Sequence, residues 1–179
     1  MNVNVFKTKI DEVLIFQPEE FIDERGYLIE SYNKSLYEKF LPSTNFVQDN
    51  ESKSSFGVLR GLHFQTEPYS QAKLVRVVKG EIQDVAVDVR KDSSTYLKYV
   101  SVNLSDKNKK QLYIPRGFAH GFLVLSNEAI VSYKIDNIFD LNSYQGIKFD
   151  DPQINISWKL DRKKIILSQK DSQLNYVNI

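Results

Sequence analysis

Short apolar runs separated by polar breaks dominate the middle of the chain. They are rich in β-branched and aromatic residues, which is typical of strands. The runs cover residues 73–89, 98–104, 110–115, 120–126 and 129–135. Within the first of them, Lys79 and Gly80 have the composition of a tight hairpin turn between two strands. Strands spaced this closely predict a β-sandwich or a small antiparallel barrel.

The flanking regions add few elements to this prediction. Residues 13–33 have the pattern of two further strands, and residues 35–41 that of one short helix. The tail, residues 161–177, is predicted to be helical or irregular. No internal repeat and no flexible linker divides the sequence. We therefore expect a single mostly-β domain over residues 1–179, with short helices that are mainly C-terminal.

Strand alternation predicts which side chains share a face of the sheet. If Lys79 and Gly80 form a two-residue turn, Val75 lies opposite Asp84. One face of that hairpin is then apolar but carries a lysine and carboxylates, namely Lys73, Val75, Val77, Ile82, Asp84, Ala86 and Asp88. Lys73 and Asp84 are diagonal neighbours on this face, within reach of long side chains.

The only two histidines of the chain also lie in segments with the character of sheet core. His63 is in "GVLRGLHFQ" (57–65), where alternation puts it on one face with Leu59, Gly61 and Gln65. His120 is in "IPRGFAHGF" (114–122), a second glycine-flanked apolar segment.

Tyr133 has a similar position, because alternation puts it on one face with Val131 and Ile135. A buried polar group is costly unless it is paired. Taken singly, a buried histidine or tyrosine is more often a hydrogen-bonded core residue, and Lys73 with Asp84 fits a structural ion pair. Several such groups that project into one small barrel are better explained by a functional site.

Composition narrows the function classes. The formal net charge is +1, from 24 basic and 23 acidic residues, which provides no general field for nucleic acid or a membrane surface. Without cysteine, disulfides and thiolate chemistry are excluded. The first residues lack the pattern of a signal peptide, and no apolar run has the length of a membrane span. We expect a cytoplasmic protein.

The segment "PRGFAH" (115–120) has the spacing P-x-G-x-x-H, which resembles the second conserved motif of the cupin barrels. The resemblance implies an antiparallel cupin-type barrel, or jelly roll. Metal-binding cupins have H-x-H and then a glutamate in their first motif. Here the matching segment is His63-Phe64-Gln65, with no glutamate at that spacing and with Lys73 nearby. A cation repels a metal, and two neutral ligands bind it poorly, so we expect no metal and an acid–base role for His63.

Most of the chain also resembles the dTDP-4-dehydrorhamnose 3,5-epimerase family of nucleotide-sugar epimerases. The matching stretches occur in the family's order, and they are "FIDERGYLIESYN" (21–33), "FVQDNESKSSFGVLRGLHFQ" (46–65), "QAKLVRVVKGEIQDVAVDVR" (71–90), "LYIPRGFAHGFLVLS" (112–126), "YK" (133–134), "DDP" (150–152) and "LSQKD" (167–171). A match of this extent is far more specific than any single motif.

This resemblance implies an epimerisation that needs no cofactor. A 4-keto group acidifies the protons on C3 and C5 of a nucleotide-diphosphate-linked 4-keto-6-deoxy sugar, one proton is removed to form an enolate, and a proton returns on the opposite face. By similarity His63 is the base and Asp171 supports its imidazole. Lys73 stabilises the enolate oxygen, and Tyr133 is the acid. Asp171 lies in a segment that the pattern of the residues does not place.

The resemblance also implies substrate-binding residues, which are Arg25, Glu30, Gln48, Asn50, Arg60 and His120. On the residues alone, Arg25 and Glu30 fit a surface turn, and residues 48–52 a loop. Arg60 is on the wrong face by simple alternation, so we expect a twist or bulge at Gly61, or action from the barrel rim. Family members form homodimers by exchanging N-terminal strands, which would place Arg25 and Glu30 in the neighbouring subunit's site.

One position departs from the family pattern. Eleven residues after Tyr133, family members commonly have glutamate, whereas this chain has Tyr144. Loop drift is one explanation, and a changed contact to the sugar or the base is the other. The alternatives to a 3,5-epimerase are an epimerase that acts at one carbon only, a 3,4-ketoisomerase and a non-catalytic cupin that binds a nucleotide sugar. The sequence leaves three properties of the substrate and reaction open, namely the nucleotide base, the length of the sugar and the number of epimerised carbons.

Overall fold

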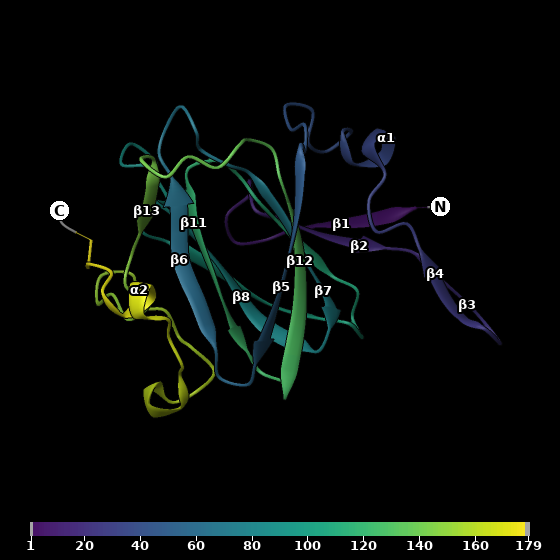
Figure 1. Ribbon diagram of the computed structural model, residues 1–179. Helices are drawn as coiled ribbons and strands as arrows, with labels where there is room; N and C mark the ends of the chain where they lie inside the picture. The colour runs from purple at the N-terminus through teal and green to yellow at the C-terminus, as the bar shows by residue number, and fades with distance from the viewer. Residues whose placement is uncertain (1, 178–179) are drawn as a thin grey trace.

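The computed structural model describes residues 2–177, whose strands form two antiparallel sheets (Figure 1). The larger sheet has the order β1 (Val3–Lys7), β2 (Leu14–Pro18), β10 (Gln111–Ile114), β7 (Lys73–Lys79), β12 (Glu128–Ile135) and β5 (Gln48–Ser55). The smaller sheet has the order β13 (Tyr144–Gly146), β6 (Leu59–Gln65), β11 (Phe118–Val124), β8 (Glu81–Asp88) and β9 (Tyr99–Ser105). The predicted mostly-β, antiparallel architecture is confirmed.

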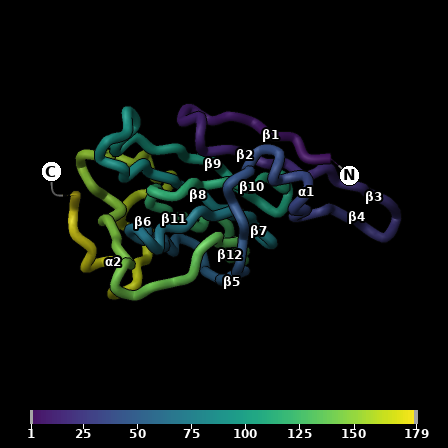
Figure 2. Tube along the Cα trace, turned by 90° about the horizontal axis from the view of Figure 1, so that it is seen from above, coloured from purple at the N-terminus to yellow at the C-terminus, as the bar shows by residue number. Residues whose placement is uncertain are grey.

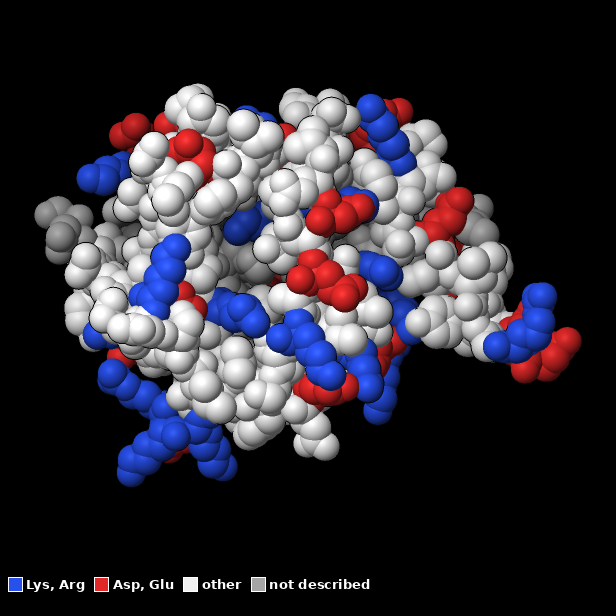
Figure 3. Space-filling model, in the orientation of Figure 1, with Lys and Arg blue, Asp and Glu red and all other residues white. Residues whose placement is uncertain are grey.

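The N-terminal region adds a hairpin that extends away from both sheets (Figures 1 and 2). It consists of β3 (Glu20–Asp23) and β4 (Gly26–Ile29). Its apolar side chains are exposed, with Phe21 at 43%, Ile22 at 74%, Tyr27 at 57% and Leu28 at 60%. Figure 3 shows charged side chains at its tip and none along most of its length. The sequence pattern predicts two strands over residues 13–33, but these residues form three, namely β2, β3 and β4. The turn before Gly26 separates β3 from β4, which the sequence prediction joins.

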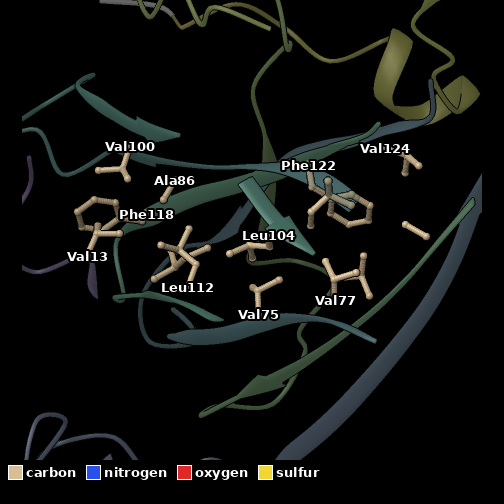
Figure 4. Packing of buried hydrophobic residues seen from close by; sticks show 14 of the residues in the cluster. Val13, Val75, Val77, Ala86, Val100, Leu104, Leu112, Phe118, Phe122 and Val124 are labelled. Atoms are coloured by element: carbon tan, nitrogen blue, oxygen red, sulfur yellow. The ribbon is translucent and has the colours of Figure 1, made fainter. Parts of the chain in front are cut away.

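The main core lies between the two sheets (Figure 4). Val75 and Val77 enter it from β7, and Ile82 and Ala86 enter it from β8. Phe118 and other side chains from β11 close the space between them. The predicted apolar face is therefore correct, since alternate residues of these strands do share one buried face.

The predicted hairpin at Lys79 and Gly80 is wrong. β7 and β8 belong to different sheets, so Val75 pairs with Leu112 and Tyr133, and not with Asp84. Gly80 has a φ of +86°, and a Cβ there would collide with the Glu128 carbonyl oxygen and the Ser126 hydroxyl. A glycine at this position lets the chain pass from one sheet to the other, which a composition typical of a turn does not distinguish from a hairpin.

A bulge in β6 decides which side chains point inward. His63 pairs with His120 and Arg60 pairs with Phe122, so β6 has one residue more than β11 between these pairs. Gly61 lies in the bulge with a φ of +124°, and a Cβ there would come within 2.6 Å of the Gly121 Cα atom. The expected bulge is therefore confirmed.

The bulge also corrects the predicted faces of β6. Arg60 and His63 line the same cavity, whereas Leu59 packs into a cluster with Leu123 and Phe149 outside the main core. The prediction that His63 shares a face with Leu59 is wrong, because the extra residue shifts the alternation between them.

Two short segments differ from expectation in extent or type. Residues 48–52 belong to β5, whose eight residues pair with β12, so the loop that the residues alone indicated is wrong. The residues of β5 are all polar, so the sequence shows no strand pattern there. The helix expected over residues 35–41 is present but shorter, as α1 (Lys34–Tyr37), and Asn33 caps it by accepting a hydrogen bond from the Ser35 amide at 3.1 Å.

The C-terminal segment covers the smaller sheet. It contains a 3₁₀ turn (Arg162–Lys164) and α2 (Gln169–Ser172), in agreement with the helical or irregular tail that was predicted. Leu167 packs with Leu59 and Leu123, and the Leu59 amide donates to the Ile166 carbonyl at 2.9 Å. This packing places α2 beside β6. No helix within residues 2–177 is long and apolar enough to cross a membrane.

Candidate active site

A cavity of about 490 Å³ lies between the two sheets, where β6 and β11 face β7 and β12. A second cavity of about 360 Å³ adjoins it and shares His63, Lys73, Tyr133 and Tyr144 with it. In Figure 3 the molecule is hollowed between the regions of β6 and β5, and basic side chains lie around the hollow. Three of the four predicted catalytic residues therefore border both parts of one space.

Asp171, on α2, is hydrogen-bonded to the His63 imidazole on β6. The His63 Nε2 atom lies 2.6 Å from Asp171 Oδ1, and the Asp171 side chain is only 6% exposed. Burial alone would raise the pKa of Asp171, but hydrogen bonds from His63, the Gly61 amide and the Ser168 hydroxyl lower it. The carboxylate is thus ionised and only accepts, so Nε2 carries the proton. In the neutral imidazole this leaves the lone pair on Nδ1, which faces away from the Nε2–Asp171 contact.

Lys73 and Tyr133 come from the sheet opposite His63. Lys73 begins β7, and Tyr133 lies on β12, where it pairs with Asn50 and Val75. Burial lowers the pKa of Lys73 to about 8, and nearby Asp84 opposes this effect. Burial raises the pKa of Tyr133, with Arg60 opposing, so its phenol is protonated at neutral pH. One wall of the cavity therefore holds an imidazole, and the other holds an amine and a protonated phenol.

His120 and Arg60 complete the inner cavity. His120 lies on β11 opposite His63, and its Nε2 atom is 2.7 Å from Asp84 Oδ1. Arg60 donates from Nε to the Ser54 hydroxyl at 2.9 Å, while much of its side chain stays exposed. A guanidinium held at a cavity mouth suits a diphosphate, because it can donate two hydrogen bonds to one group.

The outer cavity brings together polar and aromatic side chains. Gln48 and Asn50 line it from β5, and Gln48 donates to Asn50 at 2.8 Å. The Tyr144 ring lies 5.3 Å from the His63 ring and 5.8 Å from the Phe139 ring. Its position on β13, beside β6, makes Tyr144 part of the cavity wall.

Two predicted binding residues lie elsewhere. Arg25 is exposed in the turn of the β3–β4 hairpin and pairs with Asp23. Glu30 lies within weak hydrogen-bonding distance of the Asn33 amide, at 3.4 Å. Neither residue lines the two cavities of this chain.

Several lining residues escaped the sequence prediction of the site, among them Ser52, Phe139 and Lys170. Ser52 follows Asn50 by two positions, so correct assignment of β5 as a strand would have found it. Lys170 lies with its Nζ atom 3.6 Å from the Tyr144 ring centroid, a cation–π contact. Phe139 lies in a loop, where alternation gives no signal.

Gln65 stands where metal-binding cupins have a second histidine, and in this structure its side chain has a structural role. Its amide nitrogen donates to the carbonyl oxygens of Tyr69 and Ile138, at 2.7 and 3.0 Å, and its oxygen accepts from the Asp140 amide at 2.7 Å. The side chain therefore anchors the loop that carries Phe139.

Comparison with known proteins identifies the family of the chain. Residues 7–178 match the family model described as dTDP-4-dehydrorhamnose 3,5-epimerase. The chain belongs to this family. The Shigella flexneri dTDP-4-dehydrorhamnose 3,5-epimerase is 54% identical over 94% of this chain and 93% of its own length. The corresponding protein of Methanothermobacter thermautotrophicus is 51% identical over 92% of this chain and 89% of its own length.

A solved structure extends the likeness to three dimensions. The epimerase of Legionella pneumophila, in complex with dTDP-4-keto-L-rhamnose, is 45% identical and has a TM-score of 0.94. The alignment covers 98% of this chain and 93% of that one. The expected family membership and the cupin-type fold of this epimerase are therefore confirmed.

Proposed function

We propose that this chain epimerises C3 and C5 of a thymidine-diphosphate-linked 4-keto-6-deoxyhexose without a cofactor. One observation carries the proposal most directly. His63, paired with Asp171, and Tyr133 come from opposite sheets and line one cavity together with Lys73. A sugar ring between the two sheets would meet a base on one face and an acid on the other, which inversion at carbon requires.

The proposed steps use only these side chains. Nδ1 of His63 removes the proton from C3 or C5, and the electrons of that C–H bond move toward C4 to form an enolate. The Lys73 ammonium stabilises the negative charge on the C4 oxygen. Tyr133 then donates its phenolic proton to the opposite face of the carbanionic carbon, which inverts the centre. Solvent restores the protonation states of His63 and Tyr133.

The remaining cavity residues fit a nucleotide-sugar substrate. Arg60 at the mouth would bind the diphosphate, and Gln48, Asn50 and His120 would hydrogen-bond the sugar or the base. Two expectations from the sequence stay predictions, namely a reaction without a cofactor and a cytoplasmic location.

The test is to incubate the purified chain with the thymidine-linked 4-keto-6-deoxyhexose and to follow the product configuration by NMR. We expect inversion at both C3 and C5. Unchanged substrate at high enzyme concentration would contradict the proposal, and so would a product inverted at one carbon only.

We further propose that the chain acts as one domain in a homodimer that exchanges its N-terminal hairpins. Phe21, Ile22, Tyr27 and Leu28 are 43–74% exposed on a hairpin that the rest of the chain covers only in part, mainly through Lys109 over the Tyr27 ring. Burial of such side chains contributes about 1.5–3 kcal/mol each, so a partner subunit is a favourable cover. Exchange would also carry Arg25 toward the partner's cavity, which explains why it lies outside the cavities of its own chain.

Subunit complementation tests this exchange. Arg25→Ala and His63→Asn should each be strongly impaired as homodimers. If Arg25 serves the partner's site, a mixed dimer contains one intact site. A refolded one-to-one mixture should then recover about a quarter of the wild-type activity, as random pairing of subunits predicts. No recovery, with mixed dimers verified by mass spectrometry, would refute a shared site, and a wild-type monomer at micromolar concentration would refute the dimer.

Tyr144 offers a test of specificity. Its ring packs against His63 and Phe139, and the Lys170 ammonium lies over the ring. At position 144 other family members commonly have a glutamate. We expect Tyr144→Glu to change the relative kcat/KM for thymidine-, guanosine- and cytidine-linked 4-keto sugars by about 1–3 kcal/mol, as one altered contact does. Tyr144→Phe, which keeps the ring, is the matched control and should change the ranking less. An unchanged ranking in Tyr144→Glu would show that this position does not select the substrate.

A further inference from the structure

A second buried histidine–carboxylate pair lies beside the first, and the proposed steps do not use its carboxylate. His120 Nε2 lies 2.7 Å from Asp84 Oδ1, and the Asp84 side chain is 0% exposed. The other oxygen, Oδ2, is buried and has no hydrogen-bond partner within residues 2–177. A buried carboxylate oxygen without a partner is costly, so this arrangement requires an explanation.

Asp84 and Lys73 approach one another from opposite sheets. Asp84 lies on β8 and Lys73 on β7, and both side chains are on strand faces that enclose the interior. The Lys73 ammonium donates no hydrogen bond to any residue from 2 to 177, although Lys73 lines both cavities. Burial works against its ammonium form, and Asp84 is the charged neighbour that favours it.

We propose that Asp84 is a positioning residue that keeps Lys73 protonated and directed at the keto oxygen of the substrate, and that His120 holds the Asp84 carboxylate in place. The inference rests on the proposed function of Lys73 as the group that stabilises the enolate. It also gives the unpaired oxygen a role, because an oxygen without another donor can interact with the Lys73 ammonium.

The other titratable or charged groups around the two cavities come from five elements, and they are Arg60 and His63 (β6), His120 (β11), Tyr133 (β12), Tyr144 (β13), and Lys170 and Asp171 (α2). Asp171 is paired with His63. Burial lowers the pKa of His120 although Asp84 opposes it, so His120 is neutral at neutral pH. Both tyrosines have a raised pKa and are neutral too. Among the described lining groups and their partners, Asp84 is thus the carboxylate available to Lys73.

The test is to titrate Lys73 directly in the complete protein with ¹³C-labelled lysine, followed by NMR. Its signal is assigned by its absence in Lys73→Arg. In Asp84→Asn, which keeps the shape and an acceptor for His120, the Lys73 midpoint should fall by about one to three pH units. The alkaline limb of the pH profile for solvent exchange at C3 should move to lower pH with it. An unchanged midpoint in a folded Asp84→Asn protein would overturn the proposal.

Asp88→Asn is the matched control, because Asp88 is equally buried on β8 but binds Arg90, Ser93 and Thr95 away from the cavity. It should leave the Lys73 midpoint unchanged. If Asp84→Asn does not fold, Asp84→Glu is the deciding variant, because it keeps the negative charge. The Lys73 midpoint in Asp84→Glu should stay near the wild-type value, and a large fall of this midpoint would overturn the proposal. A wild-type chain without turnover, together with a shifted Lys73 in Asp84→Asn, would refute the proposed function while the Asp84–Lys73 coupling stands.

Discussion

Replacement of His63 by asparagine should almost abolish exchange of the C3 proton of the substrate with solvent. Asparagine fills similar space and can still donate to Asp171, but it has no basic nitrogen to accept the proton. Loss of a general base of this kind lowers the rate by about 100- to 10,000-fold. The measurement is deuterium incorporation at C3 in deuterated water, with wild type and His63→Asn at equal concentration.

Two controls separate a lost base from a damaged site. Thermal unfolding and dTDP binding of His63→Asn should match the wild type, because the cavity walls and Arg60 are unchanged. Asp171→Asn, which keeps the imidazole but removes the carboxylate that orients it, should reduce the rate less than His63→Asn. If His63→Asn exchanges the C3 proton at nearly the wild-type rate, another group is the base.

Replacement of Tyr133 by phenylalanine should separate proton exchange from inversion. The ring that packs against the main core is kept, and the removed hydroxyl has no hydrogen-bond partner within residues 2–177, so the fold should be unaffected. His63 should still remove the C3 proton and return a solvent deuteron to the same face. Formation of inverted product should fall by about 100-fold or more, since the acid on the opposite face is missing.

Both quantities come from one experiment, in which NMR reads deuterium in the recovered substrate and the amount of inverted product. Equal losses of exchange and inversion in Tyr133→Phe would mean that Tyr133 positions the sugar and does not act as the acid. The raised pKa of Tyr133 adds an expectation for the wild type. A general acid works only while it is protonated, so loss of inversion from this group should occur only in the alkaline range, above the ordinary pKa of a phenol.

The sequence predicts the strands and their buried faces well, because alternation of apolar residues depends only on local geometry. It fails where two arrangements have the same local pattern. Lys79 and Gly80 have the composition of a hairpin turn, yet Gly80 carries the chain between the sheets. Which strand pairs with which is decided by contacts distant in sequence, and turn composition does not report those.

The site shows the same limit. Lys73 and Tyr133 are found as polar residues on apolar strand faces, and the structure does place them in one cavity. His63 also faces that cavity, but only through the bulge at Gly61, which reverses its relation to Leu59. Asp171 lies on α2, in a tail without a clear pattern, and only the fold brings it to His63 across 108 residues of sequence.

The measurement that tests the central claim most directly is the deuterium content of the wild-type product at C3 and C5, after reaction of the thymidine-linked 4-keto-6-deoxyhexose in deuterated water. Base and acid on opposite walls of one cavity predict an inverted product with deuterium at both carbons. Inverted product without deuterium would contradict proton exchange through an enolate, and deuterium at one carbon alone would contradict epimerisation at both.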